Sequence, residues 1–218
     1  IGYIASYQSQ DVAAFKGILN IPEIEDDEEF FEFELNYDDE NDWVNFNLLG
    51  NPFSFDIVWE ENIDCNKIAE DGFITLNSAT GGYVYNAEGV IKSGEGFMVY
   101  AETKRVSLEY YKTPAKSRRD NYDYINIIAS NKNASDNVIL RFGDTESAGL
   151  PKLDNINPNI ADVYVRNEGK RYGIFSYNPD VTEIPLYFDA KEMGTYTLTF
   201  DVKGDYENLY LLDKMTGE

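Results

Sequence analysis

The residues that could do chemistry in this chain are mainly carboxylates. The 218 residues include 40 Asp and Glu, 18 Lys and Arg, one Cys and no His. Without histidine, the chain cannot build a Ser-His or Cys-His catalytic pair or a His-ligated zinc or iron site. The sequence also lacks the glycine-rich P-loop and the glycine motif of dinucleotide-binding folds. Carboxylate chemistry is the enzymatic route that remains.

A carboxylate glycosidase would use two of these acids on either side of a glycosidic bond. Retaining enzymes hold the two carboxylates roughly 5 Å apart, and inverting enzymes hold them about 6.5–9.5 Å apart. No spacing in this strand-rich sequence singles out such a pair. We therefore predict a chain that is not an enzyme, name no catalytic residue, and keep a glycosidase as the less favoured alternative.

Twelve acidic residues and no Lys or Arg fall in the segment Glu23–Asp42. Calcium takes clustered carboxylate and carbonyl oxygens, and the weak candidate ligands in this segment are Asp38, Asp39, Glu40 and Asp42. Their spacing does not match an EF-hand loop. We expect a solvated loop followed by an outer strand face, with no cofactor, and calcium binding is the alternative.

Aromatic side chains supply a second kind of candidate site. They make up 15% of the chain, and an exposed aromatic ring can stack on a sugar ring. Tyr83 and Tyr85 lie on one arm of a predicted hairpin, and Trp43 lies at the start of a predicted strand. A tyrosine in a strand more often packs against its cross-strand neighbours, so these three residues are candidates for glycan binding only if they are exposed.

The net charge restricts the partners of the chain. A formal charge of −22 and a pI near 4.2 repel nucleic acids and anionic membrane surfaces. No apolar run approaches the length of a membrane span. Cys65 is the only cysteine and cannot form a disulfide within the chain. The partner that we expect instead is a glycan or another surface protein.

The elements that would position these residues are β-strands, because apolar residues alternate with polar ones along most of the chain. The alternation is clear in three segments, with apolar residues at Phe31, Phe33, Leu35 and Tyr37, at Val106, Leu108 and Tyr110, and at Tyr196, Leu198, Phe200 and Val202. Glycine-containing turns separate the strands, in "SATGGY", "NAEG", "KSGEG" and Asn167–Gly169. Helix is predicted only for residues 62–72 and for a short turn near residues 11–15.

A structural corner is predicted at Gly50, Asn51 and Pro52, after the alternating strand that begins at Val44. Gly50 can adopt a backbone conformation that is costly for other residues, and the residue before a proline favours extended geometry. Trp59 follows the corner and should fold back onto the core. This corner favours a turn over a catalytic loop.

A polar segment without alternation, residues 114–121, is predicted to be a linker. Residues 1–113 hold 6 basic and 23 acidic side chains, a charge of −17, whereas residues 114–218 hold 12 and 17, a charge of −5. The predicted fold class is all-β. It consists of two consecutive antiparallel β-sandwich or jelly-roll-like domains with little helix, over residues 1–113 and 122–218.

Several motifs resemble β-rich modules in large exported and surface proteins of gut and oral Gram-negative anaerobes. "FNLLGNPF" and the later "GEGFMVYA" are similar to a pair of strands in those modules. "GYIASY" with "FKGIL" resembles their opening, and "IPLYFDAKEMGTYTLTF" with "LYLLDKMTG" resembles their closing half. The resemblance implies a position near the C-terminal end of a multi-domain protein, often ahead of a type IX secretion sorting domain. It implies no catalytic residues.

Together these observations favour a non-catalytic module, a spacer or an adhesion domain, outside the cell or on its outer surface. A carbohydrate-binding module that uses exposed aromatic rings is the alternative. The two functions differ in one observable, the solvent exposure of the candidate rings.

Overall fold

The computed structural model describes residues 30–64, 72–111, 122–143, 149–206, 208–214 and 216–217. These residues form an all-β fold with several antiparallel sheets, which confirms the predicted fold class. The strands of the first half are β1 (Phe30–Glu34), β2 (Phe46–Gly50), β3 (Ile57–Val58), β4 (Ile63–Asp64), β5 (Phe73–Asn77), β6 (Gly82–Asn86), β7 (Val90–Ile91), β8 (Gly96–Tyr100) and β9 (Ser107–Tyr111). The strands of the second half are β10 (Asp123–Ser130), β11 (Ser135–Phe142), β12 (Leu150–Pro151), β13 (Asp162–Asn167), β14 (Lys170–Tyr177), β15 (Tyr187–Asp189) and β16 (Thr197–Lys203). The short helical turns are η1 (Asp42–Asn45) and α1 (Trp59–Asn62).

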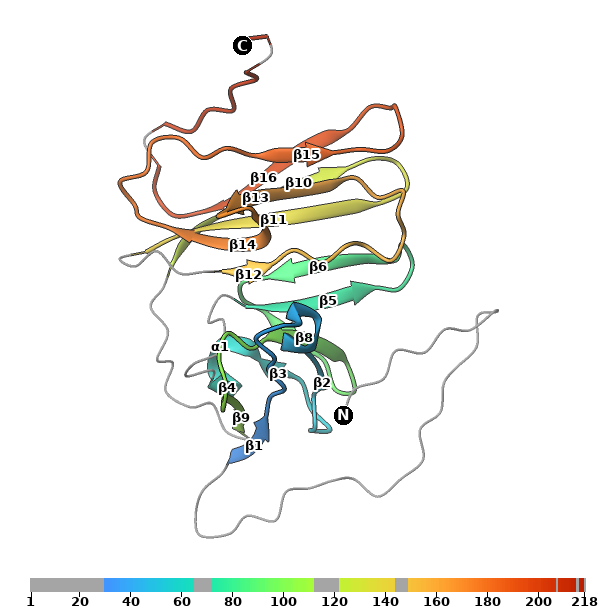
Figure 1. Ribbon diagram of the computed structural model, residues 1–218, viewed down its shortest axis with the longest axis vertical. Helices are drawn as coiled ribbons and strands as arrows, with labels where there is room; N and C mark the ends of the chain where they lie inside the picture. The colour runs from blue at the N-terminus through green and yellow to red at the C-terminus, as the bar shows by residue number, and fades with distance from the viewer. Residues whose placement is uncertain are drawn as a thin grey trace.

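The sheets follow one another along the long axis of the molecule, from β1 and β9 at one end to β15 and β16 at the other (Figure 1). A three-stranded sheet has the order β1-β9-β4, and a four-stranded sheet has the order β2-β8-β5-β6. The largest sheet has the order β15-β13-β14-β11-β10-β16, with β12 also paired to β14. Within it, β11 and β14 run parallel, while its other pairs are antiparallel.

The strand β8 lies inside the four-stranded sheet and is buried on both faces, which explains its nearly continuous apolar sequence. On one face, Phe97 and Val99 join a cluster with Trp59 and Leu108. Trp59 is fully buried there, as the sequence predicts. On the other face, neighbouring residues such as Met98 join a second cluster. The alternation of a strand thus places successive side chains in two different cores.

The second cluster crosses from one half of the chain to the other. It contains Ile74 and Met98 from the four-stranded sheet together with Ile139 and Ile174 from the largest sheet. The other face of the largest sheet carries a third cluster, which includes Val138 and many further residues of the second half. The predicted linker lies outside the described residues, so the division into two domains stays a prediction. Strands of the two halves, β5 and β8 before the linker and β11 and β14 after it, share the second cluster.

The predicted turns are found in the described residues, but one predicted alternation and one predicted strand start are wrong. Phe200 and Val202 are exposed, and β16 is largely exposed on both faces. Val44 lies in η1, and the strand expected to begin there begins at Phe46.

β5 and β6 form the predicted hairpin, and Glu168 and Gly169 both have positive φ in the turn between β13 and β14. The apolar side chains Val106, Leu108 and Tyr110 are all buried.

The predicted helix over residues 62–72 is wrong at its start, because Asn62 ends α1 and β4 follows directly. Cross-strand pairing of β4 with β9 provides the hydrogen bonds that a helix would otherwise supply. Residues 65–71, with Cys65, and the predicted turn near residues 11–15 lie outside the described residues.

Within the ranges described above, every helix is too short and too polar to cross a membrane.

Candidate functional site

The corner after β2 is held by the side chain of Asn51, which is buried. Its amide nitrogen donates to the carbonyl oxygens of Phe55 (2.8 Å) and Ile91 (3.1 Å), and its Oδ1 accepts from the backbone N–H of Phe53 (2.9 Å). These bonds tie the loop after β2 to β7. The structure thus places Asn51 in a structural role.

Gly50 differs from the sequence-based expectation. It is the last residue of β2 and pairs with Gly96 of β8. Its φ is not positive, in contrast to that of several other described glycines. A Cβ atom on Gly50 would meet only the carbonyl oxygen of Glu95, at 3.8 Å. The prediction that Gly50 supplies a special backbone conformation is wrong, because the strand continues through Gly50 and the chain turns after it.

The carboxylates of the acidic loop before η1 contact separate partners. Asp39 forms an exposed ion pair with Lys104, and Asp42 pairs with Lys170 at 3.1 Å. Asp38 accepts a hydrogen bond from the backbone N–H of Glu40 (2.8 Å). Lys104 lowers the pKa of Asp39, chiefly through their hydrogen bond. In the described part of the chain, no group of three or more acidic or cysteine side chains is arranged to hold a metal ion.

Tyr85 does not fit the role of an exposed stacking ring. Only 2% of its surface is exposed, because its ring packs against Gly173 of β14 in the second cluster. Burial raises the pKa of its phenol well above the usual value. The sequence predicts that Tyr85 lies in a strand. Whether its ring is buried or exposed depends on how β6 packs against the largest sheet.

The other two aromatic candidates lie in different surroundings. Tyr83 is half-buried, and its backbone N–H donates to Oδ1 of Asn155 (2.8 Å). Trp43 is 64% exposed and has its ring centroid 6.2 Å from that of Phe46, at a tilt of 50°. Of the three predicted residues, Trp43 alone presents most of its ring to solvent.

Where β6 meets the largest sheet, a buried polar cluster fills the contact. We call it the polar junction and define it as Tyr85, Asp136, Asn137, Lys152 and Asn155. The Asn137 side chain accepts from the backbone N–H of Tyr85 (3.0 Å) and donates to its carbonyl oxygen (2.9 Å). These are the two hydrogen bonds that the backbone of a paired strand would make with Tyr85. The Tyr85 hydroxyl accepts from the backbone N–H of Leu153 (2.6 Å).

An ion pair between Lys152 and Asp136 lies at the centre of the polar junction. Both side chains have no exposed surface, and Nζ of Lys152 is 2.8 Å from each carboxylate oxygen. Nζ also donates to the carbonyl oxygen of Asn137 (2.8 Å) and lies 4.5 Å from the centre of the Tyr85 ring. Burial lowers the pKa of the Lys152 ammonium, and the Asp136 carboxylate opposes this shift.

A second group of aromatic and charged side chains lies on β13, β14 and β15, with Tyr164 buried and Tyr187 partly exposed. We call it the aromatic–arginine surface and define it as Tyr164, Arg166, Arg171, Tyr187 and Asp189. Tyr164 and Tyr187 are cross-strand partners whose rings stack at 5.5 Å and 9°. The Arg166 guanidinium lies 5.0 Å from the Tyr187 ring, and the Tyr164 hydroxyl donates to Asp189 (2.6 Å).

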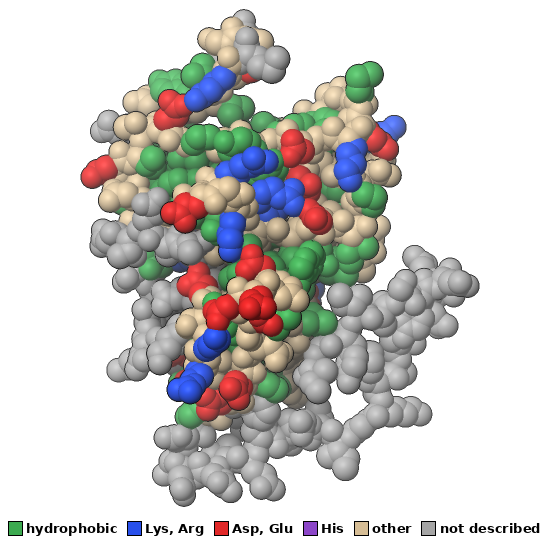
Figure 2. Space-filling model, in the orientation of Figure 1, with side chains coloured by type: hydrophobic (Ala, Val, Ile, Leu, Met, Phe, Trp, Pro, Cys, Tyr) green, Lys and Arg blue, Asp and Glu red, His purple; other side chains and the backbone are tan. Residues whose placement is uncertain are grey.

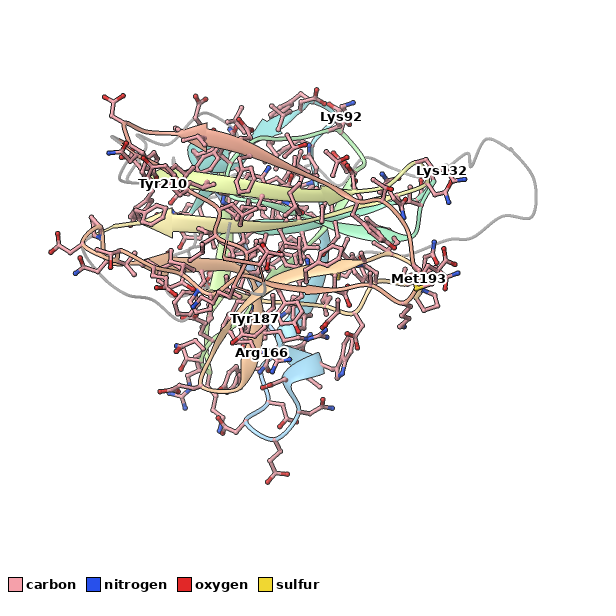
Figure 3. All side chains as sticks on the ribbon, turned by 90° about the horizontal axis from the view of Figure 1, so that it is seen from above. Lys92, Lys132, Arg166, Tyr187, Met193 and Tyr210 are labelled. Carbon is pink, nitrogen blue, oxygen red and sulfur yellow. The ribbon has the colours of Figure 1, made fainter. Side chains whose placement is uncertain are left out.

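This surface combines the groups that a polar ligand needs. Figure 3 shows Arg166 and Tyr187 next to each other on neighbouring strands, away from Met193 and Tyr210. Figure 2 shows basic and acidic side chains side by side over this sheet, beside a hydrophobic area. Tyr187 is 38% exposed on a fixed base, so it can offer ring area while the charged groups offer hydrogen bonds.

Sequence reasoning missed both groups. The signal for Lys152 was its position in "GLPKL", where a lysine has apolar neighbours, and Asp136 lies two residues before the apolar run that begins at Val138. Tyr187 lies in "IPLYFDAKEMGTYTLTF", a segment that carries part of the resemblance but no pattern of a binding site. Neither position indicates that Lys152 and Asp136 form an ion pair, because the two residues come from separate segments of the chain.

Comparison with known proteins found no matching family model, no matching curated protein and no matching solved structure.

Proposed function

We propose that this chain is a non-catalytic structural module, a spacer or adhesion domain, of a larger exported protein outside the cell or on its outer surface. The observation that carries the proposal is the polar junction, where Asn137 and Tyr85 exchange two backbone-type hydrogen bonds and Lys152 is fully buried. Buried polar groups are costly when they lose their partners. A different relative orientation of the halves would break these bonds, so the junction favours one fixed arrangement.

A fixed arrangement suits a spacer, which has to hold neighbouring domains at a set distance. The shared hydrophobic cluster adds apolar burial to the polar bonds. The resemblance to modules of exported anaerobe proteins supports the location. The charge of −22 is in keeping with a partner other than nucleic acid.

Single-molecule pulling tests this function. The chain is held by its two ends between reference domains of known unfolding force. We expect the halves to unfold in one event, because the contact between them must break before either half is exposed to the load. Two separate events at low force would overturn the spacer proposal.

A matched pair of variants locates the resistance. Tyr85→Phe keeps the buried ring but removes the hydroxyl that accepts from Leu153, so the unfolding force should fall. Tyr210→Phe removes a hydroxyl from a ring that is 83% exposed and should leave the force unchanged. Equal unfolding forces in the two variants would argue against a contribution of the polar junction to mechanical resistance.

Glycan binding at the aromatic–arginine surface is the second candidate function. The specific observation is the Tyr187 ring, which is held parallel to Tyr164 beside Arg166 and remains partly exposed. The Tyr187 side chain is already held in one orientation in the unbound chain, so stacking on a sugar would cost less conformational entropy. This replaces Tyr83 and Tyr85 as the aromatic platform, while Trp43 stays a separate candidate.

A glycan array with the purified chain tests this second function. A bound glycan should be lost in Tyr187→Ala and retained in Tyr210→Ala, since both substitutions remove a partly exposed tyrosine. Thermal unfolding of both variants provides the control for folding. If no glycan binds, or if Tyr187→Ala binds as the unchanged chain does, the surface is not a glycan site.

A further inference from the structure

The ion pair in the polar junction holds an amine against a carboxyl group in a fully buried site. Nζ of Lys152 is equally distant, at 2.8 Å, from Oδ1 and Oδ2 of Asp136. Both oxygens are bonded to Cγ, so an amine nitrogen this close to each of them also lies beside the carboxyl carbon. Amide formation needs the amine held next to that carbon, and the ion pair supplies this proximity.

The surroundings disfavour the charged form of Lys152. Both side chains are fully buried, and the Tyr85 ring covers the amine. Moving an ammonium group out of water is costly, and loss of a proton from Nζ removes its charge. Burial lowers the pKa of Lys152, in the direction that yields the nucleophilic free amine. A free amine beside a carboxyl group is the pair of groups that amide formation requires.

The carboxyl group is held by further donors. The backbone N–H of Val163 donates to Oδ2 of Asp136 (2.8 Å), and the amide nitrogen of Asn155 lies 3.4 Å from Oδ1. A fixed backbone N–H stabilises the negative charge that develops on a carbonyl oxygen during nucleophilic attack. The arrangement thus supplies a nucleophile, an electrophile and an oxyanion donor in one dry site.

From this geometry we infer that Lys152 and Asp136 become joined by an amide bond between Nζ and Cγ, which forms within the folded chain. The amine lone pair attacks Cγ, and the developing charge on Oδ2 is stabilised by Val163. Two of the three ammonium protons pass to Oδ1, the Cγ–Oδ1 bond breaks, and Oδ1 leaves as water. The remaining proton stays on the amide nitrogen. No oxidant, cofactor or other reactant is consumed, and the net charge of the chain is unchanged.

The amide would link the start of β11 to the segment after β12. A covalent link between two separate segments restricts the unfolded chain, as a disulfide does, and it cannot be reduced. The inference concerns the chemistry of the junction and holds whether or not the chain is a spacer. The hydrogen bonds between Asn137 and Tyr85 remain in either case.

The intact mass of the denatured chain tests the inference. We expect a mass that is lower than the sequence mass by one water molecule. Trypsin should then fail to cut after Lys152, because an acylated lysine is not a substrate. The residues 142–166 should appear as one peptide joined to residues 133–141, a pair that contains both reacting side chains.

Variants separate this bond from other losses of water. Lys152→Met and Asp136→Ala each remove one reacting group, so either variant should show the full sequence mass. Lys104→Met removes an exposed lysine that is also paired with an aspartate and should keep the deficit. The measurement on the unchanged chain does not depend on whether the variants fold. A full sequence mass with cleavage after Lys152, or a deficit that maps to other residues, would overturn the inference.

Discussion

Asn51 shows how one side chain can organise a corner of the molecule. Its three hydrogen bonds satisfy two backbone carbonyls and one backbone N–H around the loop after β2. Asn51→Ala leaves these groups without that partner, so we expect a loss of about 2–3 kcal/mol in the free energy of unfolding. Pro52→Ala changes mainly the unfolded chain and should cost about 0.5–1 kcal/mol. Urea denaturation measures both, and a larger effect for Pro52→Ala would contradict the role of Asn51.

Gly173 is required for the contact between Tyr85 and β14. A Cβ atom at this position would lie 2.2 Å from Cε1 of the Tyr85 ring, which is buried and cannot move aside freely. Gly173→Ala should therefore destabilise the fold by about 1–3 kcal/mol through overpacking.

Gly50→Ala is the matched control for Gly173→Ala, because its Cβ atom has open space in a strand of ordinary conformation. Its effect should stay within about 0.5 kcal/mol. Denaturant midpoints compare the two variants, and equal values would mean that Tyr85 can adapt.

At the scale of elements, the loop before η1 distributes its carboxylates among lysines of two other segments. Asp39 reaches Lys104, which precedes β9, and Asp42 reaches Lys170 at the start of β14. These pairs hold the two carboxylates to different partners rather than to one common centre. We expect calcium and sodium chloride of equal ionic strength to raise the melting temperature equally, since both screen the remaining repulsion.

Calorimetry with and without millimolar calcium measures this effect. A specific calcium site would add a stabilisation of about 2.7 kcal/mol at a hundredfold excess over the dissociation constant. Asp39→Asn would then remove the added stabilisation. A calcium-specific rise that disappears in Asp39→Asn would contradict the expectation of a solvated loop.

At the scale of the whole molecule, the shared cluster couples the two halves of the chain. The predicted linker contains the trypsin sites Lys116, Arg118 and Arg119, and we expect limited digestion to cut there into two fragments of similar mass. The fragments should elute together in gel filtration, because Ile74 and Met98 pack against Ile139 and Ile174 across the cut. They should separate only in denaturant. Fragments that separate in native buffer would show that each half is stable alone.

The class of the fold follows from local patterns in the sequence. Period-two alternation and turn chemistry are local properties, so the hairpin of β5 and β6, the turn at Glu168 and Gly169, and the buried face of β9 could be read without the tertiary structure. The absence of histidine likewise excluded whole classes of catalytic site. These inferences need only a residue and its near neighbours along the chain.

Which strand faces are buried and which charged side chains form ion pairs depends on the tertiary structure. Tyr83 and Tyr85 lie in the same strand, yet the packing of β6 against the largest sheet buries Tyr85 and leaves Tyr83 partly exposed. Lys152 and Asp136 are 16 positions apart, and Tyr85 is a further 51 positions before Asp136. Such contacts depend on how the sheets stack, and stacking is fixed by the summed burial of many side chains rather than by any local pattern.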